Sequence, residues 1–440
     1  MATLQKILLA REARAQQQKE LLTKYRCPVV SFTMNIPGPE KVSPEILRAF
    51  RWGCKALESC LEQVRFQQVT TPDTGCQALY AVAMDSHALK DLCCRIEDSL
   101  PLGRLFDMDV LTPEGNALNR GVQRGCMVCG APGRFCAASR AHSVEQLQAV
   151  TQRLLRQHFA PLDAGRIAVA VVQSLLEEVS ITPKPGLVDQ RNTGSHKDMD
   201  IATFVASARA LEPYFAECVR IGQDTAHLPP EETFPPLRRA GLLAEDAMYR
   251  ATGGVNTHKG AIYTLGILCG SMGRLWSVGD PIPAVGPILK QCAQITAPSL
   301  QRDLEASTPD TAGLRLYRRL GLTGIRGEVA NGLPSVASVG LPVYRNALAL
   351  GFSTNDAGVY TLLHLISQVA DTNLYHRGGE DGAAFAAASA KKLLRDQRFP
   401  SMDQIEALDD AFIARNLSPG GCADLLAATV FLANLSWITD

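Results

Sequence analysis

The chain has 440 residues, of which 44 are basic and 44 are acidic, so its formal net charge is zero. This length exceeds what one ordinary hydrophobic core organises, and it favours two or three domains. A neutral chain has no bulk field that would draw in nucleic acid or an anionic membrane. We therefore expect neither as a partner, and any polyanionic substrate must be held by a local cluster of charges.

Thirteen cysteines occur in a chain whose first residues show no secretory signal, because no apolar core there is followed by a small-residue cleavage site. No stretch approaches the roughly 20 uninterrupted apolar residues of a membrane span. Cysteines in the cytoplasm are usually reduced thiols, and the sequence predicts a cytoplasmic protein.

The N-terminal part of the chain mixes helix and strand signals. Apolar periodicity, turn residues and helix caps predict a helix over 4–25, a strand over 29–36, a helix from Ser43, strands over 66–71 and 78–84, a helix over 85–98, a strand over 103–111 and a helix over 143–159. This order predicts an α+β domain over residues 1–162.

The C-terminal part loses the strand-like alternation and becomes rich in long Ala- and Leu-containing stretches. These stretches predict helices over 165–179, 199–221, 236–251, 259–278, 355–370 and 382–396. We expect an all-α domain over residues 163–440, joined to the first domain by a short linker at 160–165.

The sharpest feature of the N-terminal part is the strand around Asp107 and Asp109. Side chains alternate across a strand, so Phe106, Met108 and Val110 share an apolar face while the two aspartates share the other. Two carboxylates so placed can share one Mg²⁺, which also binds phosphate oxygens and stabilises a pyrophosphate leaving group. Two solvent-facing aspartates on an ordinary strand are the alternative reading of this spacing alone.

A cysteine cluster follows this strand. Cys126, Cys129, Cys136 and His142 are chemically sufficient to bind zinc. The first two have the spacing of a metal-binding pair, but the later spacings match no zinc module that we know, so the sequence alone favours reduced cysteines without metal.

Three polar clusters stand out among the C-terminal helices. The first, within 180–200, contains Lys184, Asp189, Arg191, His196, Asp198 and Asp200. The second contains Asn256, His258, Lys259 and Gly260 and precedes an apolar helix, whose N-terminus is a natural phosphate site. The third contains Asp371, Asn373 and Arg377 together with the segment 417–424. Each is open to an ordinary reading as an interhelical loop or a helix cap.

The N-terminal motifs resemble the phosphoribosyl-dephospho-CoA transferase that makes the holo acyl carrier protein of citrate lyase. The resemblance rests on the segments 9–14, 30–39, 103–110 and 140–143. It implies a nucleotidyltransferase-like fold in which Asp107 and Asp109 are catalytic metal ligands. Arg11 and Arg14, three residues apart on one helix face, and Arg104 would contact phosphates, although a solvated basic face is the alternative for the first two. We place the phosphate-binding loop at Thr74–Gly75.

The C-terminal motifs resemble triphosphoribosyl-dephospho-CoA synthase across about 165–440, mainly in 182–189, 254–260, 371–379 and 418–424. The family reaction joins ATP to 3'-dephospho-CoA, and adenine leaves the anomeric carbon of the ribose. Positive charge that builds on the sugar can be stabilised by a carboxylate. Asp189 and Asp371 are the catalytic candidates and Asp198 and Asp200 are the metal candidates. The candidate substrate contacts are Lys184, Arg191, His196, Asn256, His258, Lys259, Gly260, Asn373 and Arg377.

The two resemblances fit together, because the product of the C-terminal part is the substrate of the N-terminal part. The expected substrates are ATP and 3'-dephospho-CoA, and the expected protein partner is the apo acyl carrier protein of citrate lyase. Two alternatives stay open from sequence: a malonate decarboxylase carrier as the partner, or one half that is catalytically silent and docks the carrier protein.

Overall fold

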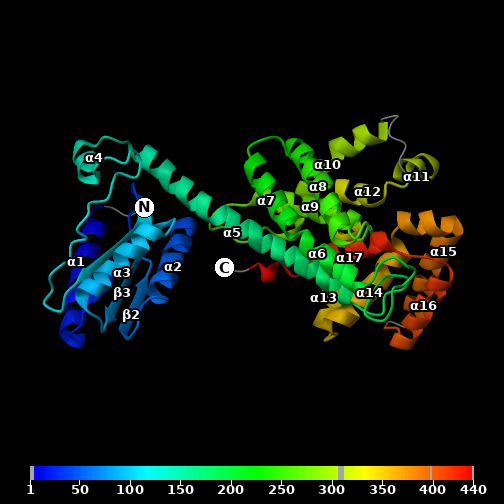
Figure 1. Cartoon of the computed structure of the whole chain (residues 1–440), viewed down its shortest axis with the longest axis horizontal. Coiled ribbons are helices and arrows are strands. Elements are labelled where there is room, and N and C mark those ends of the chain that lie inside the picture. Colours follow the sequence, from blue (N-terminus) through cyan, green and yellow to red (C-terminus); the bar gives the residue numbers. More distant parts are fainter. Residues whose placement is uncertain (1–3, 306–311, 397–398, 439–440) are drawn as a thin grey trace. The chain divides into compact units, whose positions relative to one another are not determined.

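The computed structural model describes residues 4–305, 312–396 and 399–438 (Figure 1). The chain divides into two compact units, one comprising Met1–Ala160 with Ser277–Pro281 and the other Pro161–Trp276 with Ile282–Asp440. The division lies inside the helix α5, Val144–Ser180, which contains Pro161. The expected linker at 160–165 is therefore helical. Proline removes only one backbone donor, and the Leu- and Ala-rich turns on both sides continue the helix.

The first unit contains one antiparallel sheet with the strand order β2-β3-β1-β4. Its elements before α5 are α1 (Leu4–Tyr25), β1 (Val29–Met34), α2 (Pro44–Glu58), β2 (Val64–Thr70), β3 (Gln77–Val82), α3 (Ser86–Ser99), β4 (Phe106–Leu111) and α4 (Gly133–Ser139). A short 3₁₀ turn at Gly103–Leu105 replaces the expected start of the last strand. The unit is a mixed fold of helices and strands, as the sequence predicted.

The two faces of this sheet are covered by different helices. On one face, Phe50 of α2 packs on Phe32 of β1, which contacts Phe106 of β4 at a ring-centroid distance of 5.2 Å. On the other face, Leu21 and Leu22 of α1 are buried in a cluster with strand residues that include Val29. The alternation of side chains along β4 therefore places Asp107 and Asp109 on the α1 face.

The second unit is mostly helical, as expected. After α5 its helices are α6 (Ile201–Ala210), α7 (Glu212–Thr225), α8 (Phe234–Ala251), α9 (Lys259–Leu275), α10 (Val285–Glu305), α11 (Ala312–Leu320), α12 (Gly324–Ala330), α13 (Leu341–Ala349), α14 (Thr354–Gln368), α15 (Thr372–Asp396), α16 (Met402–Ala414) and α17 (Gly420–Ala433). The helix expected over 199–221 is two helices, and the one expected over 382–396 begins ten residues earlier and bends at Gly379, where φ is 64°. Glycine tolerates this left-handed backbone without strain.

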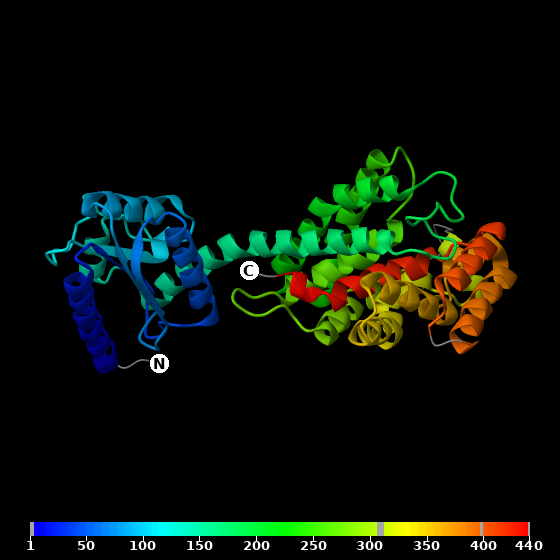
Figure 2. The same ribbon diagram turned by 90° about the horizontal axis from the view of Figure 1, so that it is seen from below.

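Helix α17 is surrounded by other helices of this unit (Figure 2). It packs against α9, α13, α14 and α15, and nine of its residues from Cys422 to Leu432 are buried. A helix that is apolar on all sides belongs in a core. By length and composition α5 is apolar enough to cross a membrane, but 56% of its most apolar window is buried, as in the core helix of a folded domain.

Candidate active sites

The paired carboxylates of the first unit lie side by side on β4. Asp107 is opposite Thr33 and Asp109 is opposite Ser31 in the antiparallel register with β1. The residue between them, Met108, is 1% exposed, whereas both aspartates are exposed. The geometry that the sequence predicted for this strand is thus present: an apolar residue anchors the strand and two acidic groups project from the opposite face.

The backbone of β4 is held on its second side by buried charged residues of α3 and by Arg124 of the loop after β4. Lys90 donates to the carbonyl oxygen of Met108 at 3.0 Å, and the carboxylate of Glu97 accepts from the Met108 N–H at 2.7 Å. Arg124 donates to the carbonyl oxygen of Phe106 at 2.7 Å and forms an ion pair with Glu97. These contacts satisfy strand groups that have no ladder partner there.

Cations and the carboxylate pair act on one another across the α1 face. The pKa of Asp109 is raised, first by desolvation and then by the charge of Asp107, while Lys90 and Arg14 oppose the rise. The pKa of Arg14 is lowered by burial and by Arg11, and both aspartates oppose that fall. Two adjacent like charges that are only partly compensated are a donor set suited to a hard divalent cation.

Two further predicted phosphate-binding positions of this unit, Gly75 and Arg104, have different neighbours. Gly75 lies beside Lys41, because a Cβ at Gly75 would be 3.8 Å from the Lys41 Cβ. The pKa of Lys41 is lowered by burial and by Arg11, so the turn, this lysine and α1 are neighbours. Arg104 instead donates to the carbonyl oxygen of Gly125 at 2.5 Å. Its guanidinium is engaged with the loop after β4.

In the second unit, the three polar clusters of the sequence converge on the start of α17. Asp371, which is 3% exposed, accepts the Cys422 N–H and the Asn373 N–H, each at 2.8 Å. A Cβ at Gly421 would lie 3.1 Å from the Asp371 carboxylate, so glycine there permits the close approach. Burial raises the pKa of Asp371, and the two N–H donors oppose that rise.

The second cluster meets the same helix through Asp424. Its carboxylate accepts a backbone hydrogen bond from Ala261 in the first turn of α9, and its pKa is raised by burial and by Glu178 and Asp371. A Cβ at Gly260 would lie 1.8 Å from a carboxylate oxygen of Asp424. The helix start that we expected to contact a phosphate therefore has an internal carboxyl group, that of Asp424, beside its first N–H groups.

The side chains next to Gly260 point in different directions. His258 is 4% exposed and its Nδ1 lies 2.7 Å from the Ser207 hydroxyl. Burial, with the nearby charge of Lys184, lowers the pKa of His258 to about 3, so the ring is neutral. Lys259 forms an ion pair with Glu245 at 2.6 Å and is 54% exposed. The amide oxygen of Asn256 caps the Lys259 N–H at 3.3 Å.

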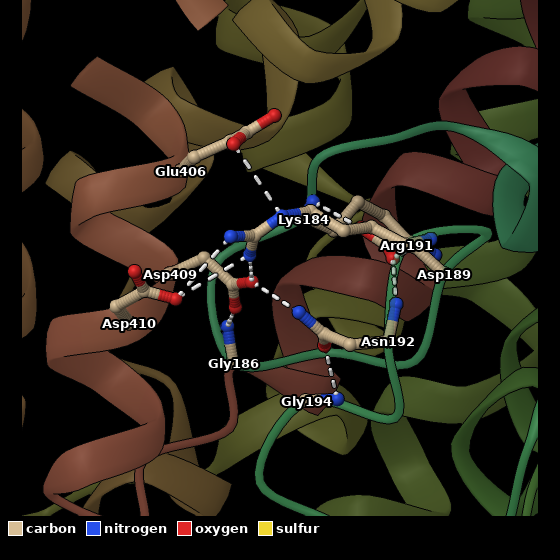
Figure 3. A network of polar contacts seen from close by, with 9 residues as sticks. All are labelled: Lys184, Gly186, Asp189, Arg191, Asn192, Gly194, Glu406, Asp409 and Asp410. Carbon is tan, nitrogen blue, oxygen red and sulfur yellow. Dashed lines mark hydrogen bonds and ion pairs between the residues drawn. The ribbon is translucent and has the colours of Figure 1, made fainter. Parts of the chain in front are cut away.

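The first cluster is a loop folded around two carboxylates (Figure 3). Asp189 accepts backbone N–H bonds from Lys184, Arg191 and Asn192 at 2.7, 2.7 and 3.0 Å. Asp409 of α16, which is fully buried, accepts from the Gly186 N–H at 2.8 Å and from the side chain of Arg191 at 2.7 Å. Both aspartates therefore hold the loop in shape.

The remaining polar side chains of this loop contact α15, the segment just before α17, and α5. The Nε2 of His196 lies 2.9 Å from the hydroxyl of Ser418, and its Nδ1 lies 3.2 Å from the guanidinium of Arg377. Burial lowers the pKa of His196, Arg377 lowers it further and Asp198 opposes both effects. Lys184, which is 2% exposed, donates to the Glu178 carboxylate at 2.5 Å.

Asp200 has a local structural partner. Its carboxylate caps α6 by accepting the Thr203 N–H at 2.8 Å, and the pair forms a capping box. Asp198 lies near His196 and Arg377, whose pKa values its charge raises. The two aspartates therefore have different surroundings.

A cavity of about 210 Å³ opens beside Asp371. Its wall includes Glu328, Thr323, Thr372 and Gly421. Glu328 is fixed by Ser335, whose hydroxyl donates to it at 2.6 Å. Of the predicted catalytic residues in this unit, Asp371 lines the cavity, whereas Asp189 is committed to loop N–H groups.

Sequence reasoning missed several residues that organise these sites: Lys41, Lys90, Glu97, Glu178, Glu328 and Asp409. Most lie inside helices that read as ordinary amphipathic segments. A charged residue at an apolar position of the helical period, such as Lys90 or Asp409, was the available signal.

Two family models match the chain. One, described as ATP:dephospho-CoA triphosphoribosyl transferase, matches residues 164–439. The other, described as apo-citrate lyase phosphoribosyl-dephospho-CoA transferase, matches residues 2–158. The two matches adjoin one another and together cover nearly the whole chain.

Two relatives match along nearly the whole chain, and a third matches part of it. The CitXG protein of Haemophilus influenzae is 36% identical over 450 residues, which cover 98% of this chain and 95% of that protein. The CitXG protein of Leuconostoc mesenteroides subsp. cremoris is 31% identical over 98% of this chain and 97% of its own. The 2-(5''-triphosphoribosyl)-3'-dephosphocoenzyme-A synthase of Klebsiella pneumoniae is 41% identical over 62% of this chain and 92% of its own.

The close approach of Gly260 in α9 to the Asp424 carboxylate in α17 can be tested by substitution. Gly260→Ala places a methyl group 1.8 Å from a carboxylate oxygen. We expect it to lower the free energy of unfolding by about 1–3 kcal/mol, as overpacking does. Urea denaturation followed by circular dichroism measures this.

Gly165→Ala is the matched control, because a Cβ there meets nothing within 4 Å. Alanine replaces glycine within helix α5, so stability should stay the same or rise by up to about 1 kcal/mol. Equal effects of the two substitutions would contradict the close approach at Gly260.

Proposed function

The chain belongs to the family in which an apo-citrate lyase phosphoribosyl-dephospho-CoA transferase is fused to an ATP:dephospho-CoA triphosphoribosyl transferase, and from this premise we propose how its residues divide the chemistry. The protein is a bifunctional transferase. Its C-terminal part makes 2'-(5''-triphosphoribosyl)-3'-dephospho-CoA from ATP and 3'-dephospho-CoA, with release of adenine. Its N-terminal part then transfers phosphoribosyl-dephospho-CoA and releases pyrophosphate.

In the transfer step, a serine hydroxyl of the apo citrate lyase acyl carrier protein attacks the α-phosphorus of the triphosphoribosyl group. The new bond joins serine oxygen to phosphorus, and the bond from phosphorus to the pyrophosphate oxygen breaks. Asp107 and Asp109 are the residues that would hold Mg²⁺, which supplies charge neutralisation for the pyrophosphate. Arg14, with Arg11 and Lys41 near it, binds and orients the phosphates on the α1 face.

The observation that carries this proposal is the pair of exposed carboxylates on one face of β4, with a cation of α1 beside them. A nucleotidyltransferase-like fold accords with it, since such chemistry needs a rigid strand to hold two metal ligands.

The thirteen free cysteines are in keeping with a cytoplasmic setting.

In the synthase step, the bond between adenine and the ribose breaks and the 2'-hydroxyl of dephospho-CoA takes the place of the base. We assign Asp371 to the stabilisation of positive charge on the sugar, because it lines the cavity with Glu328. The burial that raises the pKa of Asp371 also strengthens its interaction with a nearby cationic centre.

Polar and basic side chains near the start of α15 are the groups that would contact the triphosphate. Arg377 and His196 touch one another, and Asn373 follows Asp371 by two residues. Arg191 is 32% exposed and pairs with Asp409, so an incoming phosphate would share it with that carboxylate. Lys184 is buried against Glu178, and its role is to position the loop.

Asp107→Asn and Asp109→Asn should separate the two reactions. With ATP, dephospho-CoA and apo carrier protein supplied together, we expect pyrophosphate release to fall on the order of 100-fold while adenine release is unchanged. The raised pKa of Asp109 means that the folded protein disfavours the charged form of this side chain. At a pH above the usual pKa of an aspartate, Asp109→Asn removes that unfavourable charge, so the variant should be at least as stable as the unmodified protein.

Asp91→Asn on α3 is the control, an exposed aspartate of the same unit. It should leave both products at the level of the unmodified protein. Normal pyrophosphate release from both strand variants would exclude the two aspartates from the transfer.

A malonate decarboxylase carrier, offered in a parallel assay, should give less product than the citrate lyase carrier.

Asp371→Asn should lower adenine release on the order of 100-fold, because the amide carries no charge to stabilise the sugar. Asp381 is exposed on α15, and its substitution Asp381→Asn should leave the rate of adenine release unchanged. The melting temperature of both variants distinguishes a catalytic loss from unfolding. Undiminished adenine release by a folded Asp371→Asn variant would rule the assignment out.

A further inference from the structure

The segment between β4 and α5 brings together three thiols and an imidazole from separate positions. Cys126 and Cys129 lie on a tight turn, in which the Cys126 N–H donates to Ala131 at 2.5 Å and the Gly130 N–H donates back to Cys126 at 2.9 Å. Gly130 adopts a φ of 75°, which suits glycine. Cys136 comes from α4.

His142 completes the set from the residues just before α5. One ligand atom of each of the four residues lies within 4.8 Å of all the others. The sulfurs of Cys129 and Cys136 are 3.5 Å apart, and the Nε2 of His142 is 3.2 Å from the sulfur of Cys129. Zinc with sulfur ligands at about 2.3 Å in a tetrahedron places neighbouring sulfurs about 3.8 Å apart. The spacing therefore matches one shared cation.

Surroundings distinguish this cluster from ordinary buried cysteines. Cys129 is exposed, Cys126 and His142 are partly exposed, and only Cys136 of the four is buried. Apolar burial therefore does not explain why all four side chains point at one another. The Val128 N–H also donates to the sulfur of Cys126 at 3.4 Å, the kind of contact that orients a metal-bound thiolate.

We propose that Cys126, Cys129, Cys136 and His142 form a structural zinc site that fastens the loop after β4 to the edge of the sheet. The loop makes that contact through residues next to the cluster. Arg124 donates to the carbonyl oxygens of Phe106 and Gly103, and Arg104 donates in return to Gly125. Four protein ligands close the coordination sphere, so the metal has no open position for chemistry.

The site has a functional consequence that rests on the proposed role of β4. Through Arg124 the loop holds the first residue of the 3₁₀ turn, Gly103, and the first residue of β4, Phe106, which precedes Asp107. Loss of zinc should loosen this edge and weaken phosphoribosyl transfer on the order of tenfold, while adenine release by the helical unit continues.

Metal analysis of the full chain purified under reducing conditions tests the site directly. We expect one zinc per chain, and Co²⁺ substitution should give the intense near-ultraviolet band of cobalt–thiolate bonds. Cys129→Ser and His142→Ala should each lower the zinc content severalfold. Cys60→Ser, an exposed cysteine elsewhere in the same unit, should keep it.

Metal content is independent of the transfer reaction, so the two proposals can fail separately. Zinc bound by the unmodified chain with no change in pyrophosphate release on its removal would keep the site and overturn its link to β4. Absence of zinc and of the cobalt band from the unmodified, reduced chain would overturn the site itself. A Cys129–Cys136 disulfide in the protein as isolated, found by peptide mapping, would overturn it as well.

Discussion

The helical unit depends on buried carboxylates that must find backbone N–H donors. A buried ionised group without partners costs several kcal/mol, so each such residue fixes the chain segments around it. Asp371 joins the starts of α15 and α17, Asp424 joins α17 to α9, and Asp409 joins α16 to the loop at Gly186. Glycines stand at the closest of these approaches, because a Cβ would occupy the position of the carboxylate.

The same requirement shapes the first unit in a different way. The outer side of β4 has no neighbouring strand in the order β2-β3-β1-β4, and charged side chains take the place of a ladder. Lys90 and Glu97 hold both backbone groups of Met108, which leaves the flanking aspartates free to project. In each unit most of these charged groups hold backbone groups in place. A few carboxylates remain accessible: Asp107 and Asp109 on the α1 face of the sheet, and Asp371 in the cavity wall.

Sequence patterns predicted the side-chain geometry of β4 more completely than the tertiary contacts of the helical unit. Strand alternation places Asp107 and Asp109 on one face whatever the rest of the fold does, because the period of a strand is local. In the helical unit the polar clusters were recognised, and the structure adds tertiary partners that their spacing did not indicate. Asp200 is a helix cap, Lys259 faces a surface glutamate and Asp189 organises a loop. A local pattern gives no information on which distant N–H groups a carboxylate will meet.

The sequence by itself determined the two kinds of domain, the alternation of β4 and the motifs that resemble the two transferases, since all of these depend on local periodicity and residue type. Only the tertiary structure decided which acidic groups remain available. It filled the start of α9 with Asp424, placed Asp371 in a cavity wall and gathered Cys126 and its three partners around one point. The first two outcomes depend on contacts between residues tens to hundreds of positions apart, and the third depends on how the loop between β4 and α5 folds, which its cysteine spacing did not specify.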